Sequence, residues 1–192
     1  MNFAERVRGI LFEPRAEWPR VAAEATTPQS LYTGYIMILA AIGPIALFVG
    51  LASLGFAFAL RTALLAYVNS LVAVAVLALL VDVLAPSFGG KKDYLASLQL
   101  TAYSFTAVWV AEIALVVPLL GSIVALLAGI YGFYLFMLGA PVLKKSSADR
   151  AIPFTSVVLL CAIVLAYLIE HVLFGMTFSG GPMTAAGLLP LR

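Results

Sequence analysis

The chain has 192 residues, of which 64% are hydrophobic and 10% charged, with a formal net charge of +2. Its mean hydropathy is +1.10, and because soluble domains are about 45–50% apolar and about 25% charged, an ordinary water-soluble fold is excluded. The small net charge and the confinement of aromatic residues to apolar runs argue against nucleic-acid binding. A single cysteine, Cys161, and a single histidine, His171, exclude a disulfide framework and a Cys/His zinc cluster.

Residues 1–28 predict an amphipathic segment ahead of the first long apolar run. Its first apolar side chains are spaced i, i+4, i+7 and i+8, as on one face of a helix: Phe3, Val7, Ile10 and Leu11. A second short amphipathic stretch, residues 18–24, follows Pro14. Helices of this kind lie in the membrane interface or pack on the cytoplasmic surface of their own protein, and both alternatives stay open. No apolar run here is long enough for a cleavable signal peptide.

Two membrane-spanning helices are predicted over about 31–60 and 62–85. The only ionised side chains in this whole stretch are Arg61 and Asp82. A single helix of that length would be roughly 80 Å long, whereas the hydrocarbon core of a bilayer is about 30 Å thick. The chain must therefore reverse, and Arg61 is the predicted turn. Pro44, which follows Gly43, is expected to kink the first span because it lacks a backbone donor.

Three more spans are predicted after the polar loop 86–93. Residues 94–143 are again too long for one crossing, and Pro118 marks the natural break. The predicted spans are 94–117, 119–143 and 153–174. A tail interrupted by glycine and proline follows them at 176–192. The predicted fold class is an all-α membrane protein, a five-helix transmembrane bundle over residues 29–175 with an amphipathic cytoplasmic N-terminal segment.

The cations predict which way the bundle is inserted. With five spans, the N-terminal segment and the loops 86–93 and 144–150 lie on one side of the membrane. Nine of the eleven Lys and Arg residues fall on that side: Arg6, Arg8, Arg15, Arg20, Lys91, Lys92, Lys144, Lys145 and Arg150. The positive-inside rule then places the N-terminus in the cytoplasm and the C-terminus on the outer side of the membrane.

Small residues recur roughly once per turn in the fourth span: Gly121, Ala125, Gly129 and Gly132. Lipid provides little hydrophobic drive between helices, so spans associate where small residues let two backbones approach closely. This helix-packing face is interpreted as packing within one chain. A contact between two copies of the chain, in a homo-oligomer, is the alternative.

Few ionisable side chains fall within the spans, and each is a candidate site because a charge at depth is costly. Asp82 is expected at a solvated helix end, neutralised by Lys91 or Lys92. A second group is expected in one layer near the outer surface: Glu112, Glu170, His171, Arg61 and Asn69. This polar cluster is interpreted as an ion-paired rim satisfied by Arg61. The alternative is a small pocket that takes up a cation or a proton.

Several short patterns occur together along the chain. The fourth span ends with an aromatic run at 131–134 and with Leu-Gly-Ala-Pro at 138–141. A basic loop follows at 144–150, and Pro-Phe-Thr-Ser at 153–156 opens the fifth span. The lead-in with Pro14, Trp18 and Glu24, and the Ala-Tyr-Ser at 102–104, add to the pattern. In these features the chain resembles the Yip (Ypt-interacting protein) domain family, in its bacterial inner-membrane branch. The resemblance implies a five-helix fold with a cytoplasmic N-terminus, and for that branch it implies no assigned activity or site residues.

The predicted function is that of a non-enzymatic membrane protein that binds other membrane proteins or organises the bilayer. Nothing in the sequence pairs a nucleophile with a base or a metal, so no catalytic residue, cofactor or metal is expected. The expected partners are the lipid bilayer and other membrane proteins, with a second copy of the chain as an open alternative and nucleic acid excluded. The alternative function is a small oligomeric channel or transporter that uses Glu112, Glu170 and His171.

Overall fold

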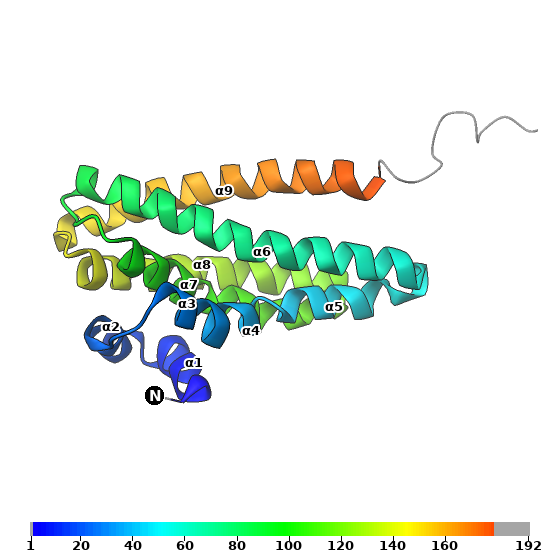
Figure 1. The fold of residues 1–192 in the computed structure, drawn as a ribbon, viewed down its shortest axis with the longest axis horizontal. Helices are drawn as coiled ribbons and strands as arrows, with labels where there is room; N and C mark the ends of the chain where they lie inside the picture. Colours follow the sequence, from blue (N-terminus) through cyan, green and yellow to red (C-terminus); the bar gives the residue numbers. More distant parts are fainter. Residues whose placement is uncertain (1, 179–192) are drawn as a thin grey trace, which may run out of the picture.

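The computed structural model describes residues 2–178, which form a bundle of long helices with two short helices against one side (Figure 1). Within these residues, five helical stretches are long and apolar enough to cross a membrane, which confirms the predicted fold class. They are Pro28–Leu54, Phe56–Phe88, Tyr94–Val116, Ile123–Lys144 and Asp149–Ile169. The predicted tail beyond residue 178 lies outside the described residues.

Two short helices, α1 (Phe3–Phe12) and α2 (Pro14–Ala23), precede the first span. A capping box made by Asn2 and Glu5 satisfies backbone donors at the start of α1. Pro14 occupies the first position of α2, where its missing N–H costs nothing. The two helices lie beside the bundle rather than beyond its end (Figure 1).

The first span is interrupted. It consists of α3 (Pro28–Leu31), a π-helical stretch η1 (Tyr32–Ile36), α4 (Met37–Leu39), α5 (Ile42–Leu51) and a 3₁₀ turn η2 (Ala52–Leu54). The kink expected at Gly43-Pro44 is present as a break at Ala40 and Ala41, between α4 and α5. Its cause is Pro44, which has no N–H to donate to the carbonyl of Ala40.

The reversal between the first two spans is at Gly55, so the prediction of a turn at Arg61 was wrong. Gly55 has φ 122° and ψ 133°, a conformation that glycine adopts readily and other residues rarely do. Arg61 instead lies within the second span, α6 (Phe56–Leu84), about a turn and a half from its start. A long arginine side chain near a helix end can reach the polar interface, so its charge does not have to mark the turn.

The remaining elements follow with short connections. They are η3 (Ala85–Phe88), α7 (Tyr94–Ala111), the 3₁₀ turn η4 (Glu112–Val116), α8 (Pro118–Lys144) and α9 (Ala148–Phe178). α8 begins at Pro118, the predicted break, after an extended residue. The loops 89–93 and 145–147 lie at the same end of the bundle, which we call the basic end.

α7 is the most buried of the five spans and packs against α6, α8 and the helices of the first span. Most of its residues between Ala96 and Ala107 are buried. The outer spans instead expose large apolar side chains: Leu126 is 68% exposed, Val83 64% and Ile163 57%. Apolar surface this extensive is unfavourable in water and is covered in a bilayer, as expected for an integral membrane protein.

Candidate functional site

The N-terminal helix pair, α1 and α2, is anchored to the bundle by Trp18. The Trp18 side chain is 1% exposed and lies against Gly139 of α8. A Cβ atom at Gly139 would be 2.6 Å from Trp18 Cε2 and 2.7 Å from Leu100 Cδ1, so the indole fits only because residue 139 has no side chain. The same indole meets the Tyr103 ring of α7 edge-on, with 6.3 Å between the ring centroids.

A buried charge cluster joins the two helices of the pair to each other and to α7. Arg6 Nη1 donates to Glu17 Oε1 at 2.6 Å, and Arg6 Nη2 pairs with Glu24. Arg20 also pairs with Glu17, at 3.2 Å. The Arg6 guanidinium is 5.5 Å from the centroid of the Tyr103 ring, within cation–π range. Arg6 is 5% exposed and Glu17 1%, so these charges are taken out of solvent by the docking of the pair.

Further contacts fasten α1 along the bundle. The Tyr131 hydroxyl of α8 donates to the carbonyl of Leu11 at 2.6 Å. The Phe3 ring is 5.6 Å from the Tyr35 ring of the first span, and Ile10 is fully buried. The apolar face of α1 therefore packs on the protein's own bundle, and the cytoplasmic location of this surface stays a prediction.

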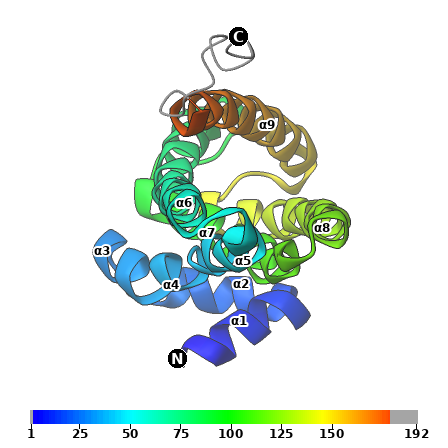
Figure 2. The same cartoon turned by 90° about the vertical axis from the view of Figure 1, so that its right-hand side faces the viewer.

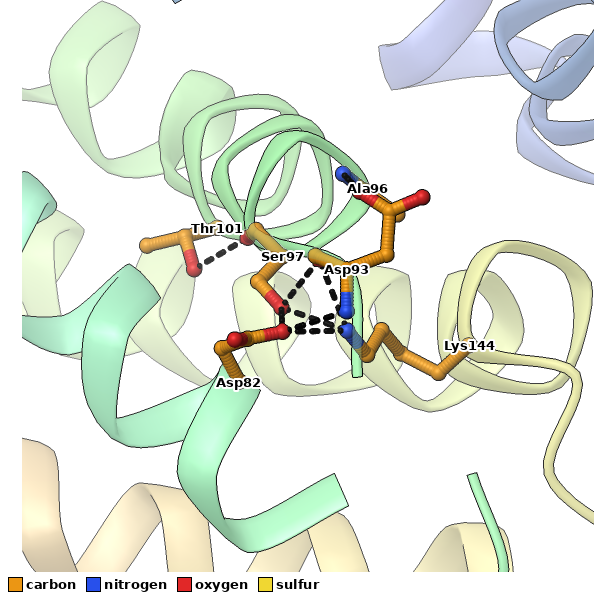
Figure 3. Close-up of polar contacts among 6 residues, drawn as sticks. All are labelled: Asp82, Asp93, Ala96, Ser97, Thr101 and Lys144. Carbon is orange, nitrogen blue, oxygen red and sulfur yellow. Dashed lines mark hydrogen bonds and ion pairs between the residues drawn. The ribbon is translucent and has the colours of Figure 1, made fainter. Parts of the chain in front are cut away.

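The basic end holds a second buried cluster, centred on Lys144 at the end of α8 (Figure 3). Lys144 Nζ donates to Asp82 Oδ1 at 3.0 Å, to the Asp93 carbonyl at 2.9 Å and to Ser97 Oγ at 2.7 Å. The three N–H donors of the ammonium group are thus all used. Asp82 Oδ1 also accepts from the Asp93 N–H at 2.6 Å. The cluster joins α6, α7 and α8 at one point.

Asp82 is therefore not the solvated helix end that the sequence suggested. It is 6% exposed, and its partner is Lys144, which is fully buried, rather than Lys91 or Lys92. The physical reason is that the end of α8 packs against α7 and the Lys144 side chain reaches Asp82 of α6, so a cation 62 residues away in sequence comes closer than one nine residues away. The Lys144 ammonium group and Asp82 Oδ1 are thus both satisfied by groups of the protein itself.

Backbone contacts hold the two loops of the basic end together. The Lys91 N–H donates to the Lys144 carbonyl at 2.7 Å. Gly90 fits closely there, because a Cβ would be 3.1 Å from the Ala85 carbonyl oxygen and 3.2 Å from that of Lys144. At the neighbouring Gly89, the corresponding Cβ would be 3.7 Å from Arg150 Nη1. Loops far apart in the sequence thus form one surface.

The predicted polar cluster near the other end is divided among different elements. The Glu112 carboxylate lies against Gly43 of α5. A Cβ atom at position 43 would clash with Glu112 Oε2. His171 is exposed on α9 and stacks on Tyr167, with 6.2 Å between ring centroids. α5 and α9 lie on opposite sides of the bundle (Figure 2), so Glu112 and His171 are not brought together.

The other members of that cluster lie on α6 and α9. Arg61 is exposed and Asn69 half-buried on α6, and the side chain of Glu170 lies outside the described part of the structure. Within the described residues, no group of three His, Cys, Asp or Glu side chains is placed to hold a metal ion.

The small residues of the fourth span have different surroundings. A Cβ at Gly121 would be 2.8 Å from Leu115 Cα, and one at Gly132 would be 3.0 Å from the Ser104 carbonyl oxygen. Both glycines thus contact other segments of the same chain. Ala125 is half-buried, and a Cβ at Gly129 would meet no atom within 4 Å, so this position faces open space.

A family model described as the Yip1 domain matches residues 8–169. The chain belongs to the Yip1 domain family. The matched region of this Yip1-domain protein runs from within α1 into α9, and so includes most of the docked helix pair and all five spans. No curated protein and no solved structure matched the chain.

Three of the patterns that resemble the Yip family come together where Trp18 anchors the helix pair to the bundle. Trp18 from the lead-in, Tyr103 from α7 and Gly139 from α8 come from three of these patterns and pack together. Sequence reasoning did not single out Arg6 or Lys144 as buried. The acidic partners of Arg6 are 11 and 18 residues away and that of Lys144 is 62 residues away, so no local spacing indicates these pairs.

Proposed function

We propose that this Yip1-domain protein is a non-enzymatic membrane protein that binds other membrane proteins through its N-terminal helix pair. The observation that carries the proposal is the fixed docking of α1 and α2. Trp18 and the buried Arg6–Glu17 pair hold the two helices against the spans. A surface held in one geometry loses little conformational entropy when a partner binds, which favours specific recognition.

The outward face of the helix pair supports a protein partner over a purely lipid one. Arg8, Glu13 and Arg15 are exposed and mix both signs of charge, whereas the apolar face is used for packing against the bundle. Insertion of that apolar face into the headgroups, which would organise the bilayer directly, requires the pair to leave its docking site. Complementary charges on a partner give orientation and a fast on-rate.

The test is photo-crosslinking from position 15 in intact membranes. We expect a discrete adduct that is lost in Trp18→Ala, which removes the anchor of the helix pair, and is kept in Gly34→Leu, where the new side chain meets open space. An adduct of twice the chain's mass would identify a second copy as the partner. An adduct pattern unchanged by Trp18→Ala would refute recognition by the docked pair.

We further propose that the basic end faces the cytoplasm of a bacterial cell, with the C-terminus outside the cytoplasmic membrane. The support is the distribution of Lys and Arg, nine of eleven of which fall on one side of the spans. A reporter cysteine placed after Arg192 in a Cys161→Ser background should react with an impermeant thiol reagent from outside, and one beside Lys145 should not. The reverse pattern would refute this orientation.

A second candidate function, a small channel or transporter, is favoured by the position of Glu112. Its carboxylate lies against Gly43, next to the break in the first span, and a carboxylate beside interrupted helical backbone can bind a cation or a proton. The test is proton and cation flux in proteoliposomes. Flux that is lost on combining Glu112→Gln with Glu170→Gln would establish this function, and its absence in the wild type would exclude it.

A further inference from the structure

A pocket of about 130 Å³ lies between four of the spans. Its walls come from α6 to α9 and include Leu77, Phe105, Phe133 and Leu159, with Gly129 contributing no side chain. The lining surface is almost entirely apolar, and the pocket is partly open rather than sealed. In Figure 2, α9 runs from beside α8 at one end of the bundle to beside α6 at the other.

The chemistry of the pocket selects an apolar occupant. Its volume is about ten times what one water molecule needs, but an apolar cavity of roughly this size stays dry and takes small hydrocarbons. It lies within the membrane-spanning helices, where the surrounding medium is the hydrocarbon of lipid chains. Leu159 on its rim is 41% exposed, so an acyl chain has access from the side.

The basic end lies where α9 begins, and the pocket residue Thr155 lies further along the same helix. Lys91, Lys92 and Lys145 are exposed on the two loops that the Lys91–Lys144 backbone hydrogen bond holds together, and Arg150 is exposed in the first turn of α9. Two exposed carboxylates, Asp93 and Asp149, belong to the same surface, so cations outnumber carboxylates by two to one. A basic surface next to membrane spans attracts anionic headgroups, by about 1 kcal/mol for each cation.

The distance between the pocket and the basic surface matches the distance from the headgroup of one lipid to its own acyl chain. Along α9, the pocket residues Thr155 and Ala162 are five and twelve residues from Arg150. At about 1.5 Å per residue, the pocket therefore lies roughly 8 to 18 Å from the basic surface. One leaflet of hydrocarbon is about 15 Å thick, so a headgroup at the loops can place its own chain in the pocket.

We propose that the pocket and the basic surface together form a binding site for one anionic glycerophospholipid. One acyl chain occupies the pocket beside Gly129, and the phosphate lies among the four cations of the basic end. The site does not depend on the protein partner proposed above, because neither α1 nor α2 contributes to it.

The chain-binding half is tested with a pocket-filling variant. In Gly129→Leu the new side chain enters open space, so the bundle is expected to fold, and Gly34→Leu is the matched control at a second open glycine outside the pocket. We expect native mass spectrometry to show phosphatidylglycerol retained by the wild type and by Gly34→Leu, and retention at least tenfold weaker for Gly129→Leu. Ala162→Phe fills the same pocket from α9 and should act alike. Wild-type retention in both pocket variants would overturn the proposal.

The headgroup half is tested by replacing Lys91, Lys92, Lys145 and Arg150 together by Gln. Wild-type protein should prefer phosphatidylglycerol to phosphatidylcholine by at least fivefold, and the quadruple variant should bind both equally. Combining Arg8→Gln with Arg15→Gln removes two exposed cations elsewhere and should keep the preference. Equal binding of the two lipids by the wild type, or an unchanged preference in the quadruple variant, would overturn headgroup selection.

Discussion

Replacing Asp82 by Leu should destabilise the bundle strongly, because it leaves a buried cation without its counterion. The Lys144 side chain is fully buried, and its ammonium group lies 3.0 Å from Asp82 Oδ1. Removing one partner of a buried ion pair costs about 3–5 kcal/mol. Ser97 Oγ and the Asp93 carbonyl still accept from Lys144, which places the expected loss toward the lower part of that range.

The assay is reversible unfolding in mixed detergent micelles, followed by far-UV circular dichroism. Asp82→Leu should lose about 3 kcal/mol, and the double variant that adds Lys144→Met should recover much of that loss, because no unpaired charge remains buried. Lys91→Met with Lys92→Met is the control, since both side chains are exposed, and it should change stability by about 0.5 kcal/mol or less. A loss below about 1 kcal/mol for Asp82→Leu, or a larger effect from the control pair, would refute the assignment of Lys144 as the partner.

Two more substitutions test the docking of the helix pair. Gly139→Ala places a Cβ 2.6 Å from Trp18 Cε2 and should cost about 1–3 kcal/mol through overpacking, whereas Gly129→Ala, at an open position of the same helix, should be close to neutral in the same unfolding assay. Arg6→Met leaves Glu17 buried with Arg20 as its remaining partner, so the pair should open more often and trypsin should cleave after Arg15 and Arg20 at least tenfold faster. Equal stability of the two alanine variants, or an unchanged cleavage rate, would contradict these assignments.

The membrane bundle could be predicted from hydropathy because the signal is local. Each span is a run of apolar residues longer than a bilayer needs, and five such runs were found at nearly the predicted places. The boundary at Gly55 was missed because two rules competed. The charge of Arg61 within an apolar run suggests a turn at that residue, but the chain turns at Gly55 because glycine can adopt a φ of 122°.

The contacts between helices could not be predicted in the same way. A rise of about 1.5 Å per residue gives the depth of Glu112 and His171, but it gives no lateral position, and the two residues lie on elements at opposite sides of the bundle. The Asp82–Lys144 pair depends on the packing of three helices. Trp18 and Gly139 were both noted in the sequence, yet only the fold reveals that one fills the space left by the other.

The docked state of the helix pair is tested most directly by the fluorescence of Trp18. In a Trp109→Phe background, Trp18 is the only tryptophan, and at 1% exposure it should emit at short wavelength. We predict that neither acrylamide in the water nor brominated lipid in the bilayer quenches it appreciably. Strong quenching by brominated lipid would place the indole against lipid acyl chains, strong quenching by acrylamide would place it in water, and either result would contradict docking against Gly139.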